Sequence, residues 1–185
     1  MILPIHTFGN AVLRKHAEPI TNEYPNVNEL INNMFETMHH ADGVGLAAPQ
    51  VGLAIRLFIV DLEAFREDKP ELADFKVAMI NPEMLEMSED GAMAEEGCLS
   101  IPGIHESVER SKSIKIKYLD ADFVEHIEVF QDFKARVIQH EYDHLEGHLF
   151  TDKVSPLRRQ LLKSKLNNIV KGKASTSYKV KSASK

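Results

Sequence analysis

Two histidines and a glutamate lie close together in the segment His140-Glu141-Tyr142-Asp143-His144. On an α-helix, the four-residue spacing of the histidines places both imidazole rings on one face, at a separation suited to sharing one metal ion. Glu141 would lie beside the ion, where its carboxylate can take a proton from water and pass it to a leaving amine. The pattern therefore indicates a metal-dependent hydrolase.

The same pattern also arises by chance. With 9 histidines among 185 residues, a shuffled chain of this composition would contain H-E-x-x-H roughly once in 25 tries. The alternative interpretation is a surface helix that carries two ordinary histidines. The choice between the two depends on whether the chain supplies a further metal ligand.

Cys98 is the best candidate for that ligand, because two histidines and a water molecule leave a tetrahedral ion one ligand short. It lies in Glu96-Gly97-Cys98-Leu99-Ser100, where the glycine lets the backbone approach closely and the thiolate can bind a borderline divalent ion. Glu146 and His148 are alternative third ligands with poorer reach. Without the histidine pair, a lone cysteine would be interpreted as a small core residue.

A loop rich in small residues precedes these segments, Gly43-Val44-Gly45-Leu46-Ala47-Ala48-Pro49-Gln50. Its two glycines and its proline rule out a continued helix and imply a backbone that is held close to another group. A simple tight turn is the alternative interpretation.

The three segments together resemble the three signature motifs of the peptide deformylase family, in the family's order and without a departure from the pattern. The resemblance runs from the N-terminus to about residue 150. It implies an α+β fold in which antiparallel β-sheets pack around the H-E-x-x-H helix. It also implies a hydrolase of co-translational N-terminal processing, which removes the N-formyl group from the formyl-methionine of nascent polypeptides and releases formate.

The resemblance also implies roles for individual residues. Cys98, His140 and His144 would bind one divalent metal ion, and a metal-bound hydroxide would attack the formyl carbon with Glu141 as general acid/base. The family suggests Fe²⁺ as the native ion. Because a thiolate–iron pair is vulnerable to oxidation, purified protein would hold Zn²⁺ or Ni²⁺ instead.

The resemblance further assigns residues around the reacting group. Gln50, through its side-chain amide, and Leu99, through its backbone N–H, would hydrogen-bond the oxygen that becomes negative, and Gly45 belongs to the same catalytic set. The methionine side chain would enter an apolar pocket near Val44 and Val137. The implied substrate-binding set is Gly43, Val44, Gly45, Glu96, Gly97 and Val137.

Helical periodicity predicts two helices in the first 150 residues. Apolar residues recur at three- and four-residue steps over residues 27 to 40, which indicates an N-terminal amphipathic helix with Asn26 as its cap. Residues 132 to 146 form the second predicted helix, which carries both histidines of the motif and ends at Gly147.

Strands are predicted between these helices, because β-branched or alternating runs are separated by turn residues. The predicted strands are Ile55 to Leu62, Val77 to Ile80, Ser113 to Tyr118 and Phe123 to Phe130. No helix separates them, so the sequence favours antiparallel pairing within an α+β fold.

A C-terminal helix is predicted over residues 156 to 171, with Ser155 as its cap and Gly172 as its end. We therefore expect a single catalytic domain over residues 1–172, which includes this helix. Residues 173–185 are rich in Ser, Lys and Ala, and we expect a basic, disordered tail there.

Charge is unevenly distributed along the chain. Residues 1–150 hold 12 Lys and Arg against 27 Asp and Glu, a net charge of −15, whereas residues 151–185 hold 10 against 1, a net charge of +9. The basic segment suggests a polyanionic partner, with the ribosome as the candidate. The alternative is a solvated, lysine-rich tail that aids solubility.

Composition also bounds the compartment. The N-terminus lacks a charged region followed by an apolar run, and no stretch approaches the roughly 18 apolar residues that a membrane span needs. The single cysteine excludes an internal disulfide and is consistent with a reducing compartment. We expect a cytoplasmic monomer without membrane association.

Two other functions remain open from the sequence. A metallopeptidase of the H-E-x-x-H type would cut peptide bonds and would take its third ligand downstream of the helix. A ribosome-binding factor with a purely structural metal would account for the basic C-terminal segment. A closed site with four protein ligands would indicate the latter.

Overall fold

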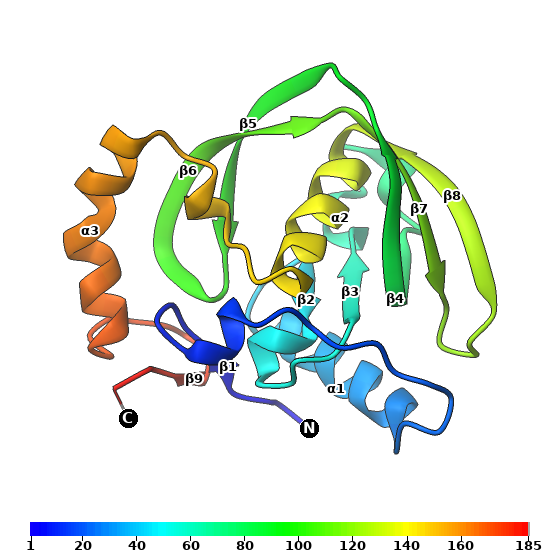
Figure 1. Ribbon diagram of the computed structural model, residues 1–185, viewed down its shortest axis with the longest axis horizontal. Helices are drawn as coiled ribbons and strands as arrows, with labels where there is room; N and C mark the ends of the chain where they lie inside the picture. The colour runs from blue at the N-terminus through cyan, green and yellow to red at the C-terminus, as the bar shows by residue number, and fades with distance from the viewer. Residues whose placement is uncertain (185) are drawn as a thin grey trace.

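Three α-helices and mainly antiparallel strands make up the computed structural model, which describes residues 1–184 (Figure 1). Helix α1 spans Val27–His40, α2 spans Asp132–Leu145 and α3 spans Pro156–Val170. All three predicted helices are confirmed, with ends that agree within one residue. Over residues 1–184, none of the helices is long and apolar enough to cross a membrane.

The helix caps were predicted with mixed success. Ser155 caps α3, since its hydroxyl oxygen accepts a hydrogen bond from the Arg158 N–H at 3.3 Å, and Gly172 beyond the helix has a left-handed φ of 67°. Asn26 also has a left-handed φ, 55°, and its side chain makes no capping hydrogen bond, so that prediction was wrong. The buried apolar face of α1 stabilises this helix without the cap.

The main sheet has five antiparallel strands in the order β2-β3-β4-β7-β8. Their bounds are β2 Gly45–Ala47, β3 Leu57–Asp61, β4 Lys76–Met87, β7 Ser113–Leu119 and β8 Glu125–Gln131. The four predicted strands correspond to β3, β4, β7 and β8, although β4 is longer than predicted and β8 begins two residues later. Antiparallel pairing within this sheet is confirmed.

Strand β3 is buried on both faces, which explains its uninterrupted apolar sequence. Phe58 and Val60 belong to the hydrophobic cluster that also contains Ala135 and Ile138 of α2. The alternate residues of β3 belong to a second cluster with the buried side chains of α1. The sheet is thus covered by α2 on one face and by α1 on the other.

A long hairpin formed by β5, Gly91–Cys98, and β6, Ile101–Ser111, lies beside this sheet and was not predicted. Glu106 and Arg110 occupy inward positions of β6, alternating with the buried Ile104 and Val108. Charged residues at inward positions conceal the alternation that would mark a strand in the sequence. The hairpin matters for function because β5 ends at Cys98.

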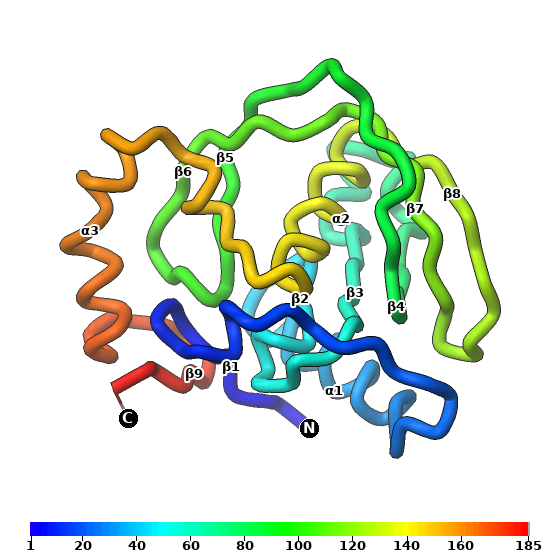
Figure 2. The backbone as a smooth tube through the Cα atoms, viewed as in Figure 1, coloured from blue at the N-terminus to red at the C-terminus, as the bar shows by residue number. Residues whose placement is uncertain are grey.

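The segment after α3 is not disordered in the structure, contrary to the prediction for residues 173–185. Strand β9, Val180–Lys181, pairs in parallel with β1, Ile5–His6, and these two segments lie side by side in Figure 2. This short pair is also the exception to the antiparallel prediction. Lys185, the last residue of the predicted tail, lies outside the described residues.

Candidate metal centre and active site

Cys98, His140 and His144 come together although 41 residues lie between Cys98 and His140 in the sequence. Their ligand atoms all lie within 4.8 Å of one another, with Cys98 Sγ 3.4 Å from His144 Nε2. Strand β5 supplies the sulfur, and successive turns of α2 supply the two rings. One sulfur and two imidazole nitrogens form a donor set that suits a borderline divalent transition-metal ion.

The two alternative ligands lie outside this cluster. The Glu146 carboxylate forms an ion pair with Arg56 at 2.7 Å and lies 3.0 Å from His16 Nδ1, and His148 is exposed. Among the described residues, Cys98 is therefore the candidate third ligand that lies with the two histidines of α2.

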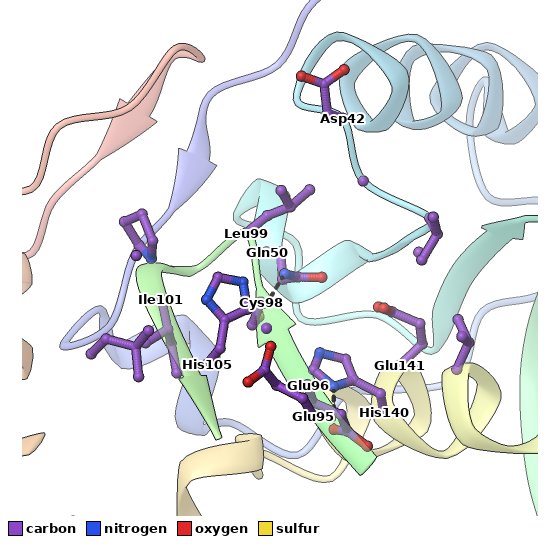
Figure 3. Close-up of a pocket in the computed structure, with 18 of the residues that line it drawn as sticks. Asp42, Gln50, Glu95, Glu96, Cys98, Leu99, Ile101, His105, His140 and Glu141 are labelled. Carbon is purple, nitrogen blue, oxygen red and sulfur yellow. Dashed lines mark hydrogen bonds and ion pairs between the residues drawn. The ribbon is translucent and has the colours of Figure 1, made fainter. Parts of the chain in front are cut away.

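His140 is oriented by a carboxylate, as metal-binding histidines commonly are. Its Nδ1 lies 2.9 Å from Glu96 Oε2, which leaves Nε2 as the nitrogen for an ion. The His140 ring also stacks on Phe150, with the ring centroids 6.0 Å apart. Figure 3 shows the Glu96 and His140 side chains in contact beside Cys98.

Glu96 is held in turn by two buried arginines. Arg110 donates two hydrogen bonds of 2.9 Å to its carboxylate, and Arg136 donates one of 2.7 Å. Burial disfavours the charged form of Glu96, but hydrogen bonds from Arg110 and His140 outweigh burial and hold its pKa well below the usual range. Glu96 is therefore ionised at neutral pH.

Glu96 lines the cavity, as expected for the predicted substrate-binding set, but its carboxylate faces other side chains of the protein. Both of its carboxylate oxygens are already engaged, and only 7% of the residue is exposed. In the structure the Glu96 carboxylate contacts His140, and a contact of Glu96 with substrate stays a prediction.

The arginines were missed by sequence reasoning. Arg136 precedes His140 by four residues, so helical spacing places it on the same face of α2 and was an available signal. Arg110 had no comparable local signal, because it lies on the unpredicted strand β6. Its second partner, Asp143, is one of the variable positions within the H-E-x-x-H motif.

Replacing Glu96 with alanine is expected to destabilise the protein by about 3–5 kcal/mol, because the guanidinium group of Arg136 would be left buried without a counter-charge and Arg110 would keep only Asp143. Metal affinity should fall roughly 10–100-fold, since His140 loses its orienting partner. Denaturant unfolding and metal titration measure the two effects.

Glu106→Ala is the matched control for this prediction. Glu106 is equally buried, at 7% exposed, and lies directly opposite Glu96 in the hairpin, but its carboxylate pairs with Arg158 on α3. It should lower stability without changing metal affinity. Equal metal affinity in both variants would contradict the role of Glu96.

Glu141 is buried, at 4% exposed, and one of its oxygens, Oε2, has no hydrogen-bond partner among the described residues. Burial raises the pKa of Glu141 to about 7, so this carboxyl can hold or release a proton near neutral pH. A Cβ atom added to Gly45 would lie 2.3 Å from the other oxygen, Oε1. Only glycine at position 45 leaves room for Glu141 as it stands.

Gln50 lies beside the ligand cluster with its amide orientation fixed. Its carbonyl oxygen accepts a hydrogen bond from the Ala47 N–H at 2.8 Å, so the NH₂ group faces the other way. That NH₂ group donates to Ser100 Oγ at 3.2 Å and lies 3.5 Å from Cys98 Sγ. The Gln50 NH₂ group is thus directed at Ser100 Oγ and at the Cys98 sulfur.

A cavity of about 680 Å³ opens onto these groups. The side chain of Leu99 lies against Gly43, since a Cβ there would be 2.7 Å from Leu99 Cδ1, and Gly97 likewise lies against His105. Figure 3 shows Gln50, Cys98, His140 and Glu141 around its interior. The predicted residues that line it are Gly43, Val44, Gly45, Gln50, Glu96, Gly97, Cys98, Leu99, Val137, His140 and Glu141. His144 lies in the ligand cluster, outside this lining.

Residues from the C-terminal segment also line the cavity, which the sequence did not indicate. They are Ser175, Thr176, Ser177 and Tyr178. The Tyr178 hydroxyl donates a 2.8 Å hydrogen bond to the Leu99 carbonyl oxygen. Burial raises the pKa of Tyr178 to about 12, so the hydroxyl keeps its proton and remains a donor.

Comparisons with known proteins agree on one family. The family model described as polypeptide deformylase matches residues 2–160. A peptide deformylase of Christiangramia forsetii is 49% identical over 98% of this chain and 96% of that protein.

Solved structures agree with this match. The crystal structure of peptide deformylase from Thermotoga maritima has a TM-score of 0.76 at 46% identity and covers 84% of this chain and 99% of its own. A Met-Ala-Ser-bound class I type b peptide deformylase from Acinetobacter baumannii has a TM-score of 0.75 at 37% identity, over 83% and 99% of the two chains. Sequence and structure together show that the chain belongs to the polypeptide deformylase family of hydrolases.

Proposed function

We propose that this chain removes the N-formyl group from the N-terminal formyl-methionine of nascent polypeptides and releases formate. The observation that carries the proposal is the convergence of Cys98, His140 and His144 with the unpartnered carboxyl oxygen of Glu141 beside one cavity. The related A. baumannii enzyme binds a Met-Ala-Ser peptide, which is consistent with a substrate that begins with methionine.

One divalent ion would be held by Cys98, His140 and His144. We propose Fe²⁺ for this ion, with Zn²⁺ or Ni²⁺ as replacements in purified protein, because the donor set suits all three. When bound, a divalent ion supplies Lewis acidity, which can lower the pKa of a coordinated water to about 7.

The chain's own residues would then handle the proton and the developing charge. Glu141 would act as general acid/base, and its pKa of about 7 suits proton transfer in both directions at neutral pH. The Gln50 NH₂ group and the Leu99 backbone N–H would donate hydrogen bonds to the formyl oxygen as it becomes negative. Gly45 contributes by leaving space for Glu141.

The glycine loop and the hairpin would flank the substrate peptide. Gly43, Gly45 and Gly97 leave room in the cavity wall for the neighbouring side chains of Leu99, Glu141 and His105. Val44 and Val137 offer apolar surface for the methionine side chain. A formyl group carries only hydrogen on its far side, so a narrow site would admit it and exclude bulkier amides.

A finer description of the fold accompanies this proposal. We propose that α2 acts as the central helix around which the sheets are arranged. Its apolar residues contact the five-stranded sheet, and Arg136 on the same helix bonds to the Val108 carbonyl of β6. We also retain the proposals of one catalytic domain through residue 172, a monomer, and a cytoplasmic location.

Formate release from paired peptides tests the function. Anaerobically purified protein should release formate from formyl-Met-Ala-Ser and leave Met-Ala-Ser uncut, with close to one metal ion per chain. Cleavage of a peptide bond in the unformylated peptide would favour the metallopeptidase instead. Bound metal without either reaction would favour a structural metal.

We further propose that α3 docks on the ribosome. Leu157 and Leu161 on this helix are 67% and 63% exposed, and Lys163 and Lys165 are exposed close by. An exposed surface that is both apolar and basic suits an RNA–protein partner. The paired strand β9 leaves less free chain for docking than a disordered tail would, so the helix carries most of this proposal.

Reversing two charges on α3, Lys163→Glu with Lys165→Glu, is expected to weaken ribosome binding roughly tenfold at low salt and to reduce its salt dependence. Co-sedimentation at several salt concentrations measures both effects. The matched control reverses Lys115 and Lys117 on β7 of the five-stranded sheet. Equal loss in both double variants, or binding that is independent of salt, would contradict docking through α3.

A further inference from the structure

The C-terminal segment is built into the wall of the substrate cavity. Ser175, Thr176, Ser177 and Tyr178 all line it, although they follow α3 and come from the far end of the chain. Figure 1 shows this segment passing from α3 to β9 beside β1.

Several contacts hold the segment in place. Tyr178 donates its hydroxyl to the Leu99 carbonyl at 2.8 Å, and the Thr176 hydroxyl donates to the Tyr178 carbonyl at 2.9 Å. Beyond them, Val180 and Lys181 pair with β1, and Ser182 is buried at 5% exposed. The wall is therefore anchored on both the β5–β6 turn and the N-terminal strand.

This wall lies beyond the part of the chain that defines the family. The family model ends at residue 160, whereas the segment begins at residue 175. The residues that would perform the reaction are thus complete without it. Its contribution concerns what surrounds the reaction centre.

The chemistry of the segment suits a peptide. Ser175 and Ser177 are exposed side chains in the cavity wall, and each hydroxyl can both donate and accept a hydrogen bond, as peptide N–H and C=O groups require. The methionine pocket is proposed at other lining residues, Val44 of the glycine loop and Val137 of α2. The part of the cavity next to the segment is therefore left for the residues that follow methionine.

We infer that residues 175–178 contact the part of the substrate that follows the formyl-methionine and thereby influence which peptides are processed. The inference rests on the proposed deformylase function and adds a specificity wall to it. Tyr178 acts as the anchor of this wall, and Ser177 presents an exposed side chain whose replacement does not disturb the core.

Charge substitutions at Ser177 test the inference. Ser177→Lys and Ser177→Glu are compared on formyl-methionyl peptides that differ only in a lysine or a glutamate placed at one of the positions after methionine. Because Asp42 and Glu95 already line the cavity, the measured quantity is the ratio of kcat/KM for the two peptides, compared between the two variants. Because Asp42 and Glu95 are present in both variants, their effect on the two peptides cancels in this comparison.

At one or more of these positions, Ser177→Lys should favour the glutamate peptide and Ser177→Glu the lysine peptide. The two ratios should differ on the order of tenfold, as expected for charges that water partly screens. The effect should decrease in high salt. Formyl-methionine amide, which lacks following residues, should be processed equally by both variants.

Ser107→Lys and Ser107→Glu are the matched controls, because Ser107 is exposed on β6 and does not line the cavity. Suppose that wild-type protein releases formate, but the kcat/KM ratio of the two peptides differs no more between the Ser177 variants than between the Ser107 variants at every position. The inference is then wrong, and the proposed function stands. If wild-type protein releases no formate from any peptide, both fail. Melting temperatures of the variants verify that each is folded.

Discussion

Glu141→Ala is expected to lower formate release by a factor of about 10²–10⁴, the range that a positioned general acid/base contributes. Metal content should remain unchanged, because Glu141 is not among the three converging ligand residues. The measurements are kcat for a formylated peptide and the metal-to-protein ratio of the same preparation.

Stability provides an independent check on this prediction. Glu141 is buried with an oxygen that lacks a hydrogen-bond partner, so its removal should not lower the melting temperature. Glu141→Gln keeps the shape of the side chain without its proton-transfer ability and should be nearly as inactive. Turnover at the wild-type rate in either variant would rule out the assigned role.

Gly45→Ala is expected to reduce kcat by roughly two orders of magnitude, since a displacement of about 1 Å in a catalytic group can cost that much. The added Cβ would lie 2.3 Å from Glu141 Oε1 and 2.8 Å from Glu141 Cδ, so the carboxylate must move. Formate release measures the effect, and metal content should again be retained.

Gly103→Ala is the control for an added methyl group in the same cavity. Gly103 lines the cavity, but a Cβ there would meet nothing within 4 Å. Its φ of 73° makes the alanine cost stability on the order of 1 kcal/mol, without displacing Glu141. If the two alanine variants had the same kcat, the close approach between Gly45 and Glu141 would have no catalytic importance.

The convergence of Cys98, His140 and His144 could be predicted because local spacing carries it. Two histidines four residues apart must share a helix face, and the single cysteine after a glycine left few other third ligands. The helices were predictable for a related reason, since the apolar stripes of α1 and α2 are buried against a sheet.

The support around the ligands could not be predicted in the same way. Glu96, Arg110 and Arg136 meet only after the β5–β6 hairpin has packed on α2, and no sequence spacing relates them. Charged residues at inward positions of β6 also imitate a solvated segment. The wall formed by the C-terminal segment was also missed, because its polar, lysine-rich composition indicated disorder. In the structure, the two-residue strand β9 and the Tyr178 hydroxyl hold this segment in place.

Among residues 1–184, the parallel pair of β1 and β9 joins the most N-terminal strand with the most C-terminal one. A chain that grows from its N-terminus cannot form this pair until translation has passed residue 181, and contacts between such distant segments form slowly. Under the proposed function, each new copy of the enzyme would therefore have its finished cavity only after its own C-terminal strand has been synthesised and paired.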